Sequence, residues 1–267
     1  VTWDLSDKMS YGGYLSLEKI LSGQHPLTEE HDEMLFIIVH QVSELWLKLT
    51  LHELTAVLGC VRRANLGPAF KMLSRVKRVQ NQLIGIWDTL GTLTPADYAR
   101  FRDSLGSSSG FQSYQFRKLE LLLGNKDAAL IEVHRHDEKN YEMLKETLNS
   151  PALYDECLQL LAKRGFEIPA SKLERNWADA YLPDPAVEAA WLEVYRNTAD
   201  HWQLYELAEA LVDIEERYQR WRFAHLKTVE RTIGFKAGTG GTSGAAYLQS
   251  TLSRRVFPEL WTLRTAL

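Results

Sequence analysis

A long helical pattern of apolar residues near the start of the chain is the feature that most limits its fold. From Leu35 to Leu58 apolar side chains recur three and four residues apart, which is the spacing of a helix that buries one face. The pattern predicts a helix from about residue 28 to 63, capped by Thr28. Phe36 and His40 then share one face. They could line a pocket, or His40 could be a core histidine with satisfied ring nitrogens.

Similar patterns along the rest of the chain indicate an all-helical protein. A turn at Asn65, Gly67 and Pro68 separates the first helix from the second, so these two should pack antiparallel. No strand alternation, internal repeat or long linker interrupts the pattern. We therefore expect one all-α helical-bundle domain over residues 1–267 with two long central helices. Beyond the first, helices are expected over residues 70–90, 94–105, 111–123, 151–165, from 184, and over 200–233.

Composition excludes several classes of protein. The net charge of -4 gives no electrostatic footprint for nucleic acid. No continuous apolar run approaches the roughly twenty residues needed to span a bilayer, so no membrane partner is expected. Cys60 and Cys157 form no CxxC pair, which argues against thiolate metal sites and disulfides and fits a reducing cytoplasm. The first residue is Val1 rather than Met, which suggests that upstream residues are missing.

Two further helical positions carry potential chemistry. Tyr98 and Arg102 are four residues apart, so a phenol and a guanidinium on one face could hold a carboxylate. A solvated surface pair is the alternative. His225 lies among Tyr218, Trp221 and other aromatic residues. A neutral imidazole presented this way can hold haem iron from one side, although a buried, satisfied histidine gives the same pattern.

The glycine-rich segment near the C-terminus resembles a phosphate-binding loop in composition but not in context. Residues 235–244 read FKAGTGGTSG, but they follow a helix rather than a strand and lack the Gly-Lys-Ser/Thr ending. We interpret residues 235–246 as a mobile lid; simple disorder is the alternative. A di-iron carboxylate bundle is improbable, because no Glu-x-x-His pair occurs in the chain.

Seven short blocks of sequence along the chain form a recognisable set. They are YGGYL at 11–15, HDEMLFIIVHQ at 31–41, SELW at 43–46, RDSLGSSSGFQ at 102–112, ELLLGNK at 120–126, WRFAH at 221–225 and IGFKAGTGGTSG at 233–244. Together they resemble the bacterial type of tryptophan 2,3-dioxygenase. The departures are mild: Thr242 stands where a serine would serve as well, and residues 127–180 carry no motif.

The resemblance implies an all-helical, cytoplasmic homotetramer, arranged as a dimer of dimers, with haem b as its cofactor. Such an enzyme cleaves the indole C2–C3 bond of L-tryptophan with O2 and gives N-formyl-L-kynurenine, the first step of tryptophan catabolism by the kynurenine pathway. An indoleamine dioxygenase-like enzyme with a broader substrate range is the alternative within this class. A non-catalytic helical scaffold or haem sensor is the alternative outside it.

The resemblance also implies a role for each matching residue. His225 would be the axial ligand of the haem iron, and His40 would be the catalytic residue that accepts the indole N–H. We favour orientation of the ring over proton abstraction for His40. Arg102 and Tyr98 would hold the substrate carboxylate, and Thr239 would meet the amino-acid end. The resemblance further places Phe36, Ile37, Ile38 and Val39 around the substrate, and Trp87, Ser109 and Gly110 around the haem. It also implies that the N-terminal segment 1–25 is exchanged between subunits. Tyr11, Tyr14 and Leu15 of this segment would then lie in a neighbour's pocket.

Overall fold

The computed structural model describes residues 3, 4 and 6–267, and this part of the chain contains helices and turns but no strand. The predicted all-α fold is confirmed. Val1, Thr2 and Leu5 of the expected N-terminal segment lie outside the described residues. The helices, with 3-10 turns marked η, are α1 (Tyr11–Leu15), α2 (Leu17–Leu21), α3 (His31–Arg62), α4 (Leu66–Leu90), α5 (Pro95–Phe101), η1 (Arg102–Leu105), η2 (Gly110–Gln112), α6 (Tyr114–Leu123), η3 (Ala128–His134), α7 (Glu138–Leu148), α8 (Leu153–Lys163), α9 (Ala170–Leu173), α10 (Pro185–Arg196), α11 (Trp202–Ile233), α12 (Ala245–Thr251), α13 (Pro258–Thr262) and η4 (Leu263–Thr265).

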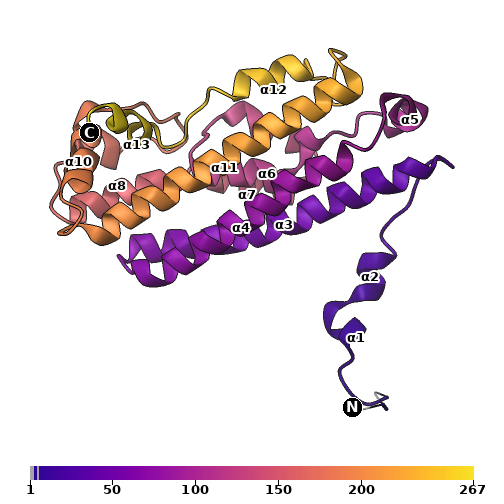
Figure 1. Ribbon diagram of the computed structural model, residues 1–267, viewed down its shortest axis with the longest axis horizontal. Helices are drawn as coiled ribbons and strands as arrows, with labels where there is room; N and C mark the ends of the chain where they lie inside the picture. Colours follow the sequence, from indigo (N-terminus) through magenta and orange to yellow (C-terminus); the bar gives the residue numbers. More distant parts are fainter. Residues whose placement is uncertain (1–2, 5) are drawn as a thin grey trace.

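Three long helices form the body of the molecule. The two long central helices expected from the sequence are α3 and α11, and α4 packs against both of them (Figure 1). A short turn joins α3 to α4, so the two run antiparallel, as predicted. The apolar stripes meet in one large core, where Val57, Val76 and Leu211 are fully buried. Burying such a side chain contributes about 1.5–3 kcal/mol, so these contacts hold the long helices in register.

The start of α3 differs from the prediction. The helix begins at His31, and Thr28 does not cap it. Instead the carboxylate of Glu33, inside the first turn, accepts hydrogen bonds from the backbone N–H groups of Leu27 and Thr28 at 2.7 and 2.8 Å and from the Thr28 hydroxyl at 2.6 Å. Burial would raise the pKa of Glu33, but these donors lower it below its usual value. The carboxylate therefore fixes the entry to the helix from within.

The turn after α3 also differs in one respect. Gly67 and Pro68 belong to the first turn of α4 rather than to the connection. A proline is tolerated there because the first N–H groups of a helix have no partner within the helix. Other predicted boundaries are confirmed: the Thr94 hydroxyl caps α5 by accepting from Asp97 N–H at 3.3 Å, and Gly124 and Gly234 end α6 and α11 with positive φ.

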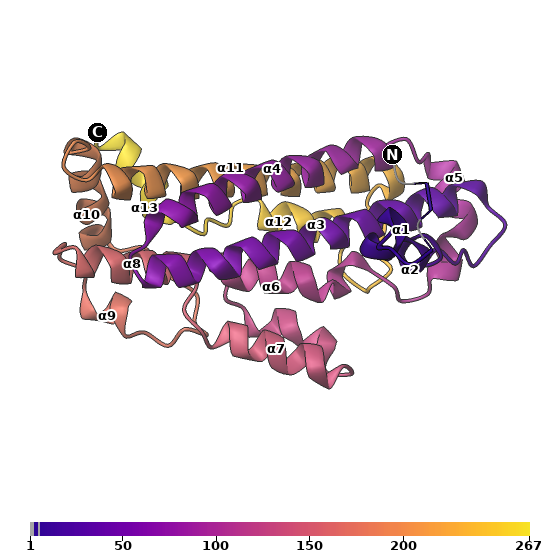
Figure 2. The ribbon, with the colours of Figure 1, turned by 90° about the horizontal axis from the view of Figure 1, so that it is seen from below.

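The C-terminal part of the chain folds back along α11. The carboxylate of Glu215, fully buried in α11, accepts the backbone N–H groups of Val256 and Phe257 at 3.0 Å each. These bonds leave no unpaired donor at a buried bend. They hold α12 and α13 beside α11, as Figures 1 and 2 show. Helix α12 thereby reaches the end of the bundle that carries the candidate site.

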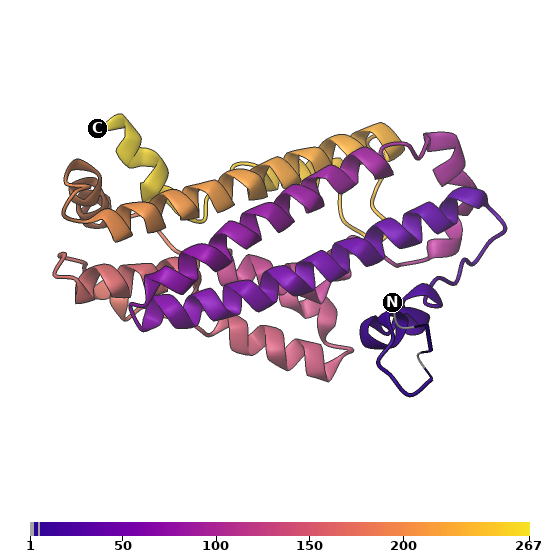
Figure 3. The ribbon, with the colours of Figure 1, turned by 60° about the horizontal axis from the view of Figure 1, so that its bottom comes forward.

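The N-terminal helices project away from the bundle. Figures 1 and 3 show that α1 and α2 lie near the start of α3 and outside the bundle. Ser16, at the break between them, has a left-handed conformation. The side chains of Tyr11 and Tyr14 are about three-quarters exposed, at 76% and 75%. Exposed apolar side chains mark an interaction site where they form a contiguous patch.

Helix α3 carries a further apolar surface. By length and composition alone, an 18-residue window of α3 is apolar enough to cross a membrane. This was not predicted from the sequence, because polar residues interrupt the apolar run. Such a window is weak evidence for a membrane span, because the central helix of a bundle passes the same test. Met34, Ile38 and Leu45 remain exposed on its outer side. The helix therefore has apolar surface that this single chain does not cover.

Candidate functional site

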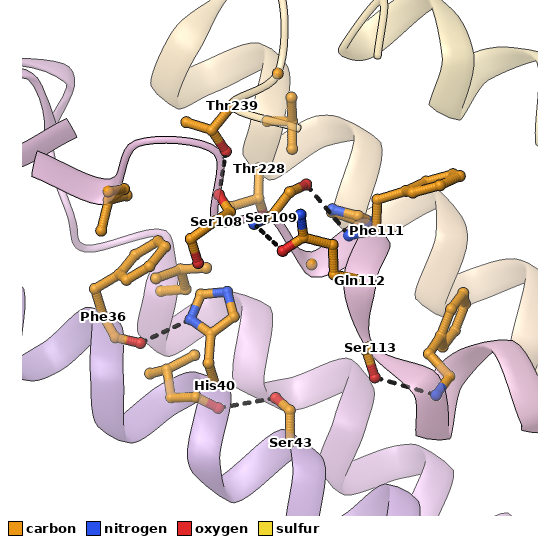
Figure 4. Close-up of a pocket in the computed structure, with 18 of the residues that line it drawn as sticks. Phe36, His40, Ser43, Ser108, Ser109, Phe111, Gln112, Ser113, Thr228 and Thr239 are labelled. Carbon is orange, nitrogen blue, oxygen red and sulfur yellow. Dashed lines mark hydrogen bonds between the residues drawn. The ribbon is translucent and has the colours of Figure 1, made fainter. Parts of the chain in front are cut away.

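A cavity of about 740 Å³ lies at one end of the bundle, where α3, α4, α5, α11 and the glycine-rich loop meet. Its volume is within the range of small-molecule and cofactor pockets. Figure 4 shows Phe36 and His40 on one wall, with Ser109 and Thr239 facing them from loops. The predicted site residues that line the cavity are Phe36, Ile37, Val39, His40, Trp87, Tyr98, Arg102, Ser109, Gly110, His225 and Thr239.

Four predicted residues do not line this cavity. Ile38 is 44% exposed on the outer side of α3, because it is two residues from both Phe36 and His40 and helical side chains two apart point in opposite directions. Tyr11, Tyr14 and Leu15 belong to α1, outside the cavity of their own chain. Their assignment to a neighbour's pocket stays a prediction.

His40 presents one free ring nitrogen to the cavity. Its Nδ1 lies 2.7 Å from the Phe36 carbonyl oxygen, one helical turn earlier (Figure 4). A carbonyl only accepts, so Nδ1 carries the proton and Nε2 is left as an acceptor. Burial lowers the pKa of His40, against smaller opposite effects of the Phe36 hydrogen bond and Glu44. The ring is therefore neutral near pH 7 and can accept a hydrogen bond from a ligand.

His225 is a neutral imidazole with no hydrogen-bond partner among the described residues. Its ring stacks on Trp87, with centroids 4.5 Å apart and planes 11° apart, and packs against Trp221 at 5.2 Å. Burial, with smaller effects of His40 and Arg117, lowers the pKa of His225 to about 3. Among the described residues, no hydrogen bond occupies either ring nitrogen. A lone pair on a fixed, neutral ring is what a metal ligand requires.

Tyr98 and Arg102 lie at the same end of the cavity. They come from α5 and from the turn η1 that follows it, and the Tyr98 ring packs 5.8 Å from Phe36. Burial raises the pKa of Tyr98, so its phenol keeps its proton. Arg102 donates from Nη2 to the Ala237 carbonyl at 2.8 Å, while its buried Nε has no acceptor among the described residues. The guanidinium therefore retains capacity for an anionic ligand.

The glycine-rich loop closes the cavity on one side. The Thr239 hydroxyl donates to the Ser108 carbonyl at 2.5 Å, and Arg102 holds the neighbouring Ala237 carbonyl. Gly240 passes so close to the Ser108–Ser109 loop that an added Cβ would lie 2.6 Å from the Cβ of Ser109. Only glycine allows this approach.

We expect Gly240→Ala to loosen the loop, because alanine cannot occupy that space without displacing Ser109. The expected result is faster proteolysis within residues 235–246 and a higher KM for the cavity's ligand. Gly85→Ala is the matched control, since nothing lies within 4 Å of a Cβ at that helical position. Equal cleavage rates for the two variants would contradict this role of Gly240.

Comparison with known proteins now places the chain. The family model described as tryptophan 2,3-dioxygenase matches residues 2–152 and 149–267. The chain belongs to the tryptophan 2,3-dioxygenase family. It is 56% identical to a protein of that name from Paraburkholderia phytofirmans, over 99% of this chain and 86% of the relative. The corresponding values for the Ralstonia pickettii protein of that name are 54%, 99% and 95%, and for the Burkholderia orbicola one 56%, 99% and 85%.

The residues of this tryptophan 2,3-dioxygenase family member suit haem better than a metal held by protein ligands alone. Within the described part of the chain, no group of three or more His, Cys, Asp or Glu side chains could hold a metal ion. A haem needs only one axial ligand, since its own macrocycle supplies four nitrogens. His225 has the donor type that such a ligand requires, and it lies in an aromatic cavity large enough for a flat ligand. The buried indole N–H of Trp87 also has no acceptor among the described residues.

Five charged residues that line the cavity were not predicted from the sequence as site residues: Glu33, Glu44, Arg117, Glu120 and Arg222. Arg117 and Glu120 come from α6, and Arg222 comes from α11, one turn before His225. All three are buried. The i, i+3 spacing of Arg117 and Glu120 was a signal for an ion pair, but the same spacing is common on solvated helix faces. Only the fold brings Arg222 to this pair.

Proposed function

We propose that this cavity is the active site of a haem-dependent dioxygenase, which cleaves the C2–C3 bond of L-tryptophan with O2 to give N-formyl-L-kynurenine. Membership of the tryptophan 2,3-dioxygenase family supports the oxidation of tryptophan and its place in tryptophan catabolism. One observation carries the assignment to this cavity. Two neutral histidines, His40 with a free acceptor nitrogen and His225 without any partner among the described residues, line the same space.

His225 would hold the haem iron, and Trp87, Ser109 and Gly110 would line the cofactor. When bound, the haem would supply the ferrous iron that makes dioxygen reactive toward an indole ring. The contribution of the protein is position and dryness. The stack of Trp87 on His225 supports this role, because it fixes the imidazole plane while leaving the ring edge free.

The other wall would hold tryptophan. The Phe36 ring would pack on the indole, beside Ile37 and Val39. Arg102 and Tyr98 would bind the substrate carboxylate, with Thr239 at the amino-acid end. The unpartnered Arg102 Nε supports this role, since a buried guanidinium nitrogen is costly without an acceptor. Binding both ends of the substrate would set the indole C2–C3 bond against the iron.

His40 would orient the indole rather than deprotonate it. Its Nε2 can accept the indole N–H, because the Phe36 carbonyl holds the proton on Nδ1. An indole N–H is far too weak an acid for a neutral imidazole to deprotonate, and the lowered pKa makes His40 a still weaker base. The expected role is one hydrogen bond that fixes the rotation of the ring.

If so, His40→Ala should remain active. A neutral hydrogen bond contributes about 0.5–1.5 kcal/mol, so kcat/KM for tryptophan should fall by about threefold to tenfold. The activity of the unmodified enzyme should also not change between pH 7 and 8, because the His40 ring is already neutral there. The checks are steady-state kinetics and substrate binding. Complete loss of turnover with unchanged tryptophan affinity would instead assign His40 a chemical step.

The assembly proposals concern the whole chain. We expect residues 1–267 to form one domain, with residues 1–25 exchanged between subunits and residues 235–246 acting as a mobile lid. The expected form is a cytoplasmic homotetramer, a dimer of dimers, without membrane or nucleic-acid partners. The exposed Tyr11 and Tyr14 and the uncovered apolar side of α3 support burial against other subunits. Analytical ultracentrifugation of the full chain, before and after deletion of residues 1–25, tests the tetramer.

The most direct test of the proposed function is an optical spectrum of the purified ferrous protein, recorded before and after addition of tryptophan and air. The expected result is a haem spectrum that responds to tryptophan, followed by the absorbance of N-formylkynurenine. Haem binding without product would favour a sensor. Comparable activity on D-tryptophan would favour an indoleamine dioxygenase-like range.

A further inference from the structure

A buried ionic cluster lies beside the wall that carries His225. We call Arg117, Glu120 and Arg222 the arginine–glutamate cluster. Arg117 Nη1 donates to one Glu120 carboxylate oxygen, and Arg222 Nη2 approaches the other at 3.3 Å. The three side chains are only 4–5% exposed. Two arginines share one carboxylate, so the cluster carries one excess positive charge.

The direct hydrogen-bond partners of the cluster do not neutralise that excess. The Tyr218 hydroxyl donates to Glu120 at 2.9 Å and accepts from Arg222 at 2.8 Å. Burial, followed by the charge of Glu120, raises the pKa of Tyr218 well above its usual value, so the phenol stays neutral. The remaining partners of Arg222 are the neutral Thr251 and Arg254 carbonyl oxygens, at 3.0 and 3.5 Å. Arg117 Nε has no acceptor among the described residues.

A series of neighbouring aromatic rings connects the cluster to His225. The Arg117 guanidinium lies 5.1 Å from the Phe116 ring centroid, Phe116 lies 4.7 Å from Trp221, and Trp221 lies 5.2 Å from His225. Aromatic side chains therefore line this path, and a charge acts more strongly through a protein interior than through solvent. The cluster also lines the same cavity as His225.

We propose that the arginine–glutamate cluster raises the reduction potential of the haem iron held by His225 and so favours the ferrous state. This inference rests on the proposed function. Reduction of ferric to ferrous iron takes up one electron and no proton, and it lowers the positive charge of the site by one. An excess positive charge nearby opposes the ferric state more than the ferrous state. The cluster is therefore a positioning and tuning element rather than a catalytic one.

The test is a spectroelectrochemical titration of the haem-loaded full chain with soluble mediators as electron donors and acceptors. Arg117→Met removes one positive charge, so the ferrous to ferric ratio at a fixed potential should fall by about tenfold, which is about 59 mV for a one-electron couple. Glu120→Gln removes the negative charge and should shift the ratio by a similar factor in the opposite direction. Arg117→Gln replaces Arg117→Met if that variant does not fold.

Two controls separate charge from packing. Tyr218→Phe removes hydrogen bonds without changing charge and should leave the potential unchanged. Arg135→Met removes an exposed arginine that pairs with Glu132 at the surface and should also have no effect. Opposite shifts for the Arg117 and Glu120 variants, with both controls unmoved, support the proposal.

Other outcomes overturn it. Shifts of the same sign in both charge variants would indicate a general change in packing. An unchanged potential together with easier haem loss from Arg117→Met would indicate that Arg117 instead holds a haem carboxylate. These results differ from failure of the proposed function, in which the unmodified protein binds no haem at His225 and there is no couple to titrate.

Discussion

Replacing His225 with alanine is expected to abolish stable haem binding and turnover of tryptophan. The side chain is the neutral imidazole of this cavity that has no hydrogen-bond partner among the described residues, and its pKa of about 3 keeps the lone pair available at every working pH. Without it, the cavity offers no comparable nitrogen ligand on that wall. The measurements are the haem content of the purified protein, the ferrous spectrum and the rate of N-formylkynurenine formation.

Controls make this result specific. His136→Ala changes an exposed histidine whose Nδ1 lies 2.9 Å from the Val133 carbonyl oxygen, and it should keep haem and activity. His225→Gly leaves space where the ring was, so added imidazole should restore part of the haem spectrum. A His225→Ala protein that kept both the original spectrum and full turnover would remove His225 from the mechanism.

Replacing Arg102 with methionine is expected to cause the second largest loss. The side chain keeps similar length but loses the charge that would pair with the substrate carboxylate. Hydrogen bonds to charged groups contribute about 1.5–3 kcal/mol, so kcat/KM for tryptophan should fall by about one to two powers of ten or more. Because Arg102 also donates to the Ala237 carbonyl at 2.8 Å, the glycine-rich loop should become less ordered in the same variant.

A comparison of substrates separates these two effects. Tryptamine lacks the carboxylate, so Arg102→Met should affect tryptamine much less than tryptophan. Arg100→Met is the matched control: Arg100 lies in α5, two residues before Arg102, its side chain is 61% exposed, and it pairs with Glu30 away from the cavity. If the unmodified enzyme uses tryptophan and tryptamine equally well, Arg102 does not act as a carboxylate clamp.

The fold could be predicted from the sequence where the signal is local. The apolar stripes of α3, α4 and α11, the Thr94 cap and the glycines after α6 and α11 depend on neighbours in the chain. The start of α3 could not, because the choice between Thr28 and Glu33 depends on how the preceding chain approaches the helix. Pro68 misled for a related reason, since it suits a turn and a first helical turn equally.

The site was less accessible to local reasoning. Spacing alone placed Phe36 with His40 and Tyr98 with Arg102, but it left surface and core readings open, and the family resemblance supplied the roles. Ile38 was included because it lies between residues that match the family, although helical geometry turns its side chain outward. The arginine–glutamate cluster was missed because Arg222 meets Glu120 across 102 residues of chain.

The position of α4 has a consequence for the chemistry. This helix packs against α3, which carries His40, and against α11, which carries His225, and its Trp87 touches the His225 ring. We therefore expect the packing of α4 to influence the distance between the two imidazoles. A conservative change in side-chain volume on the buried face of α4, at Leu83 for instance, would then change the distance between His40 and His225. It would do so without altering any group that is proposed to touch the substrate.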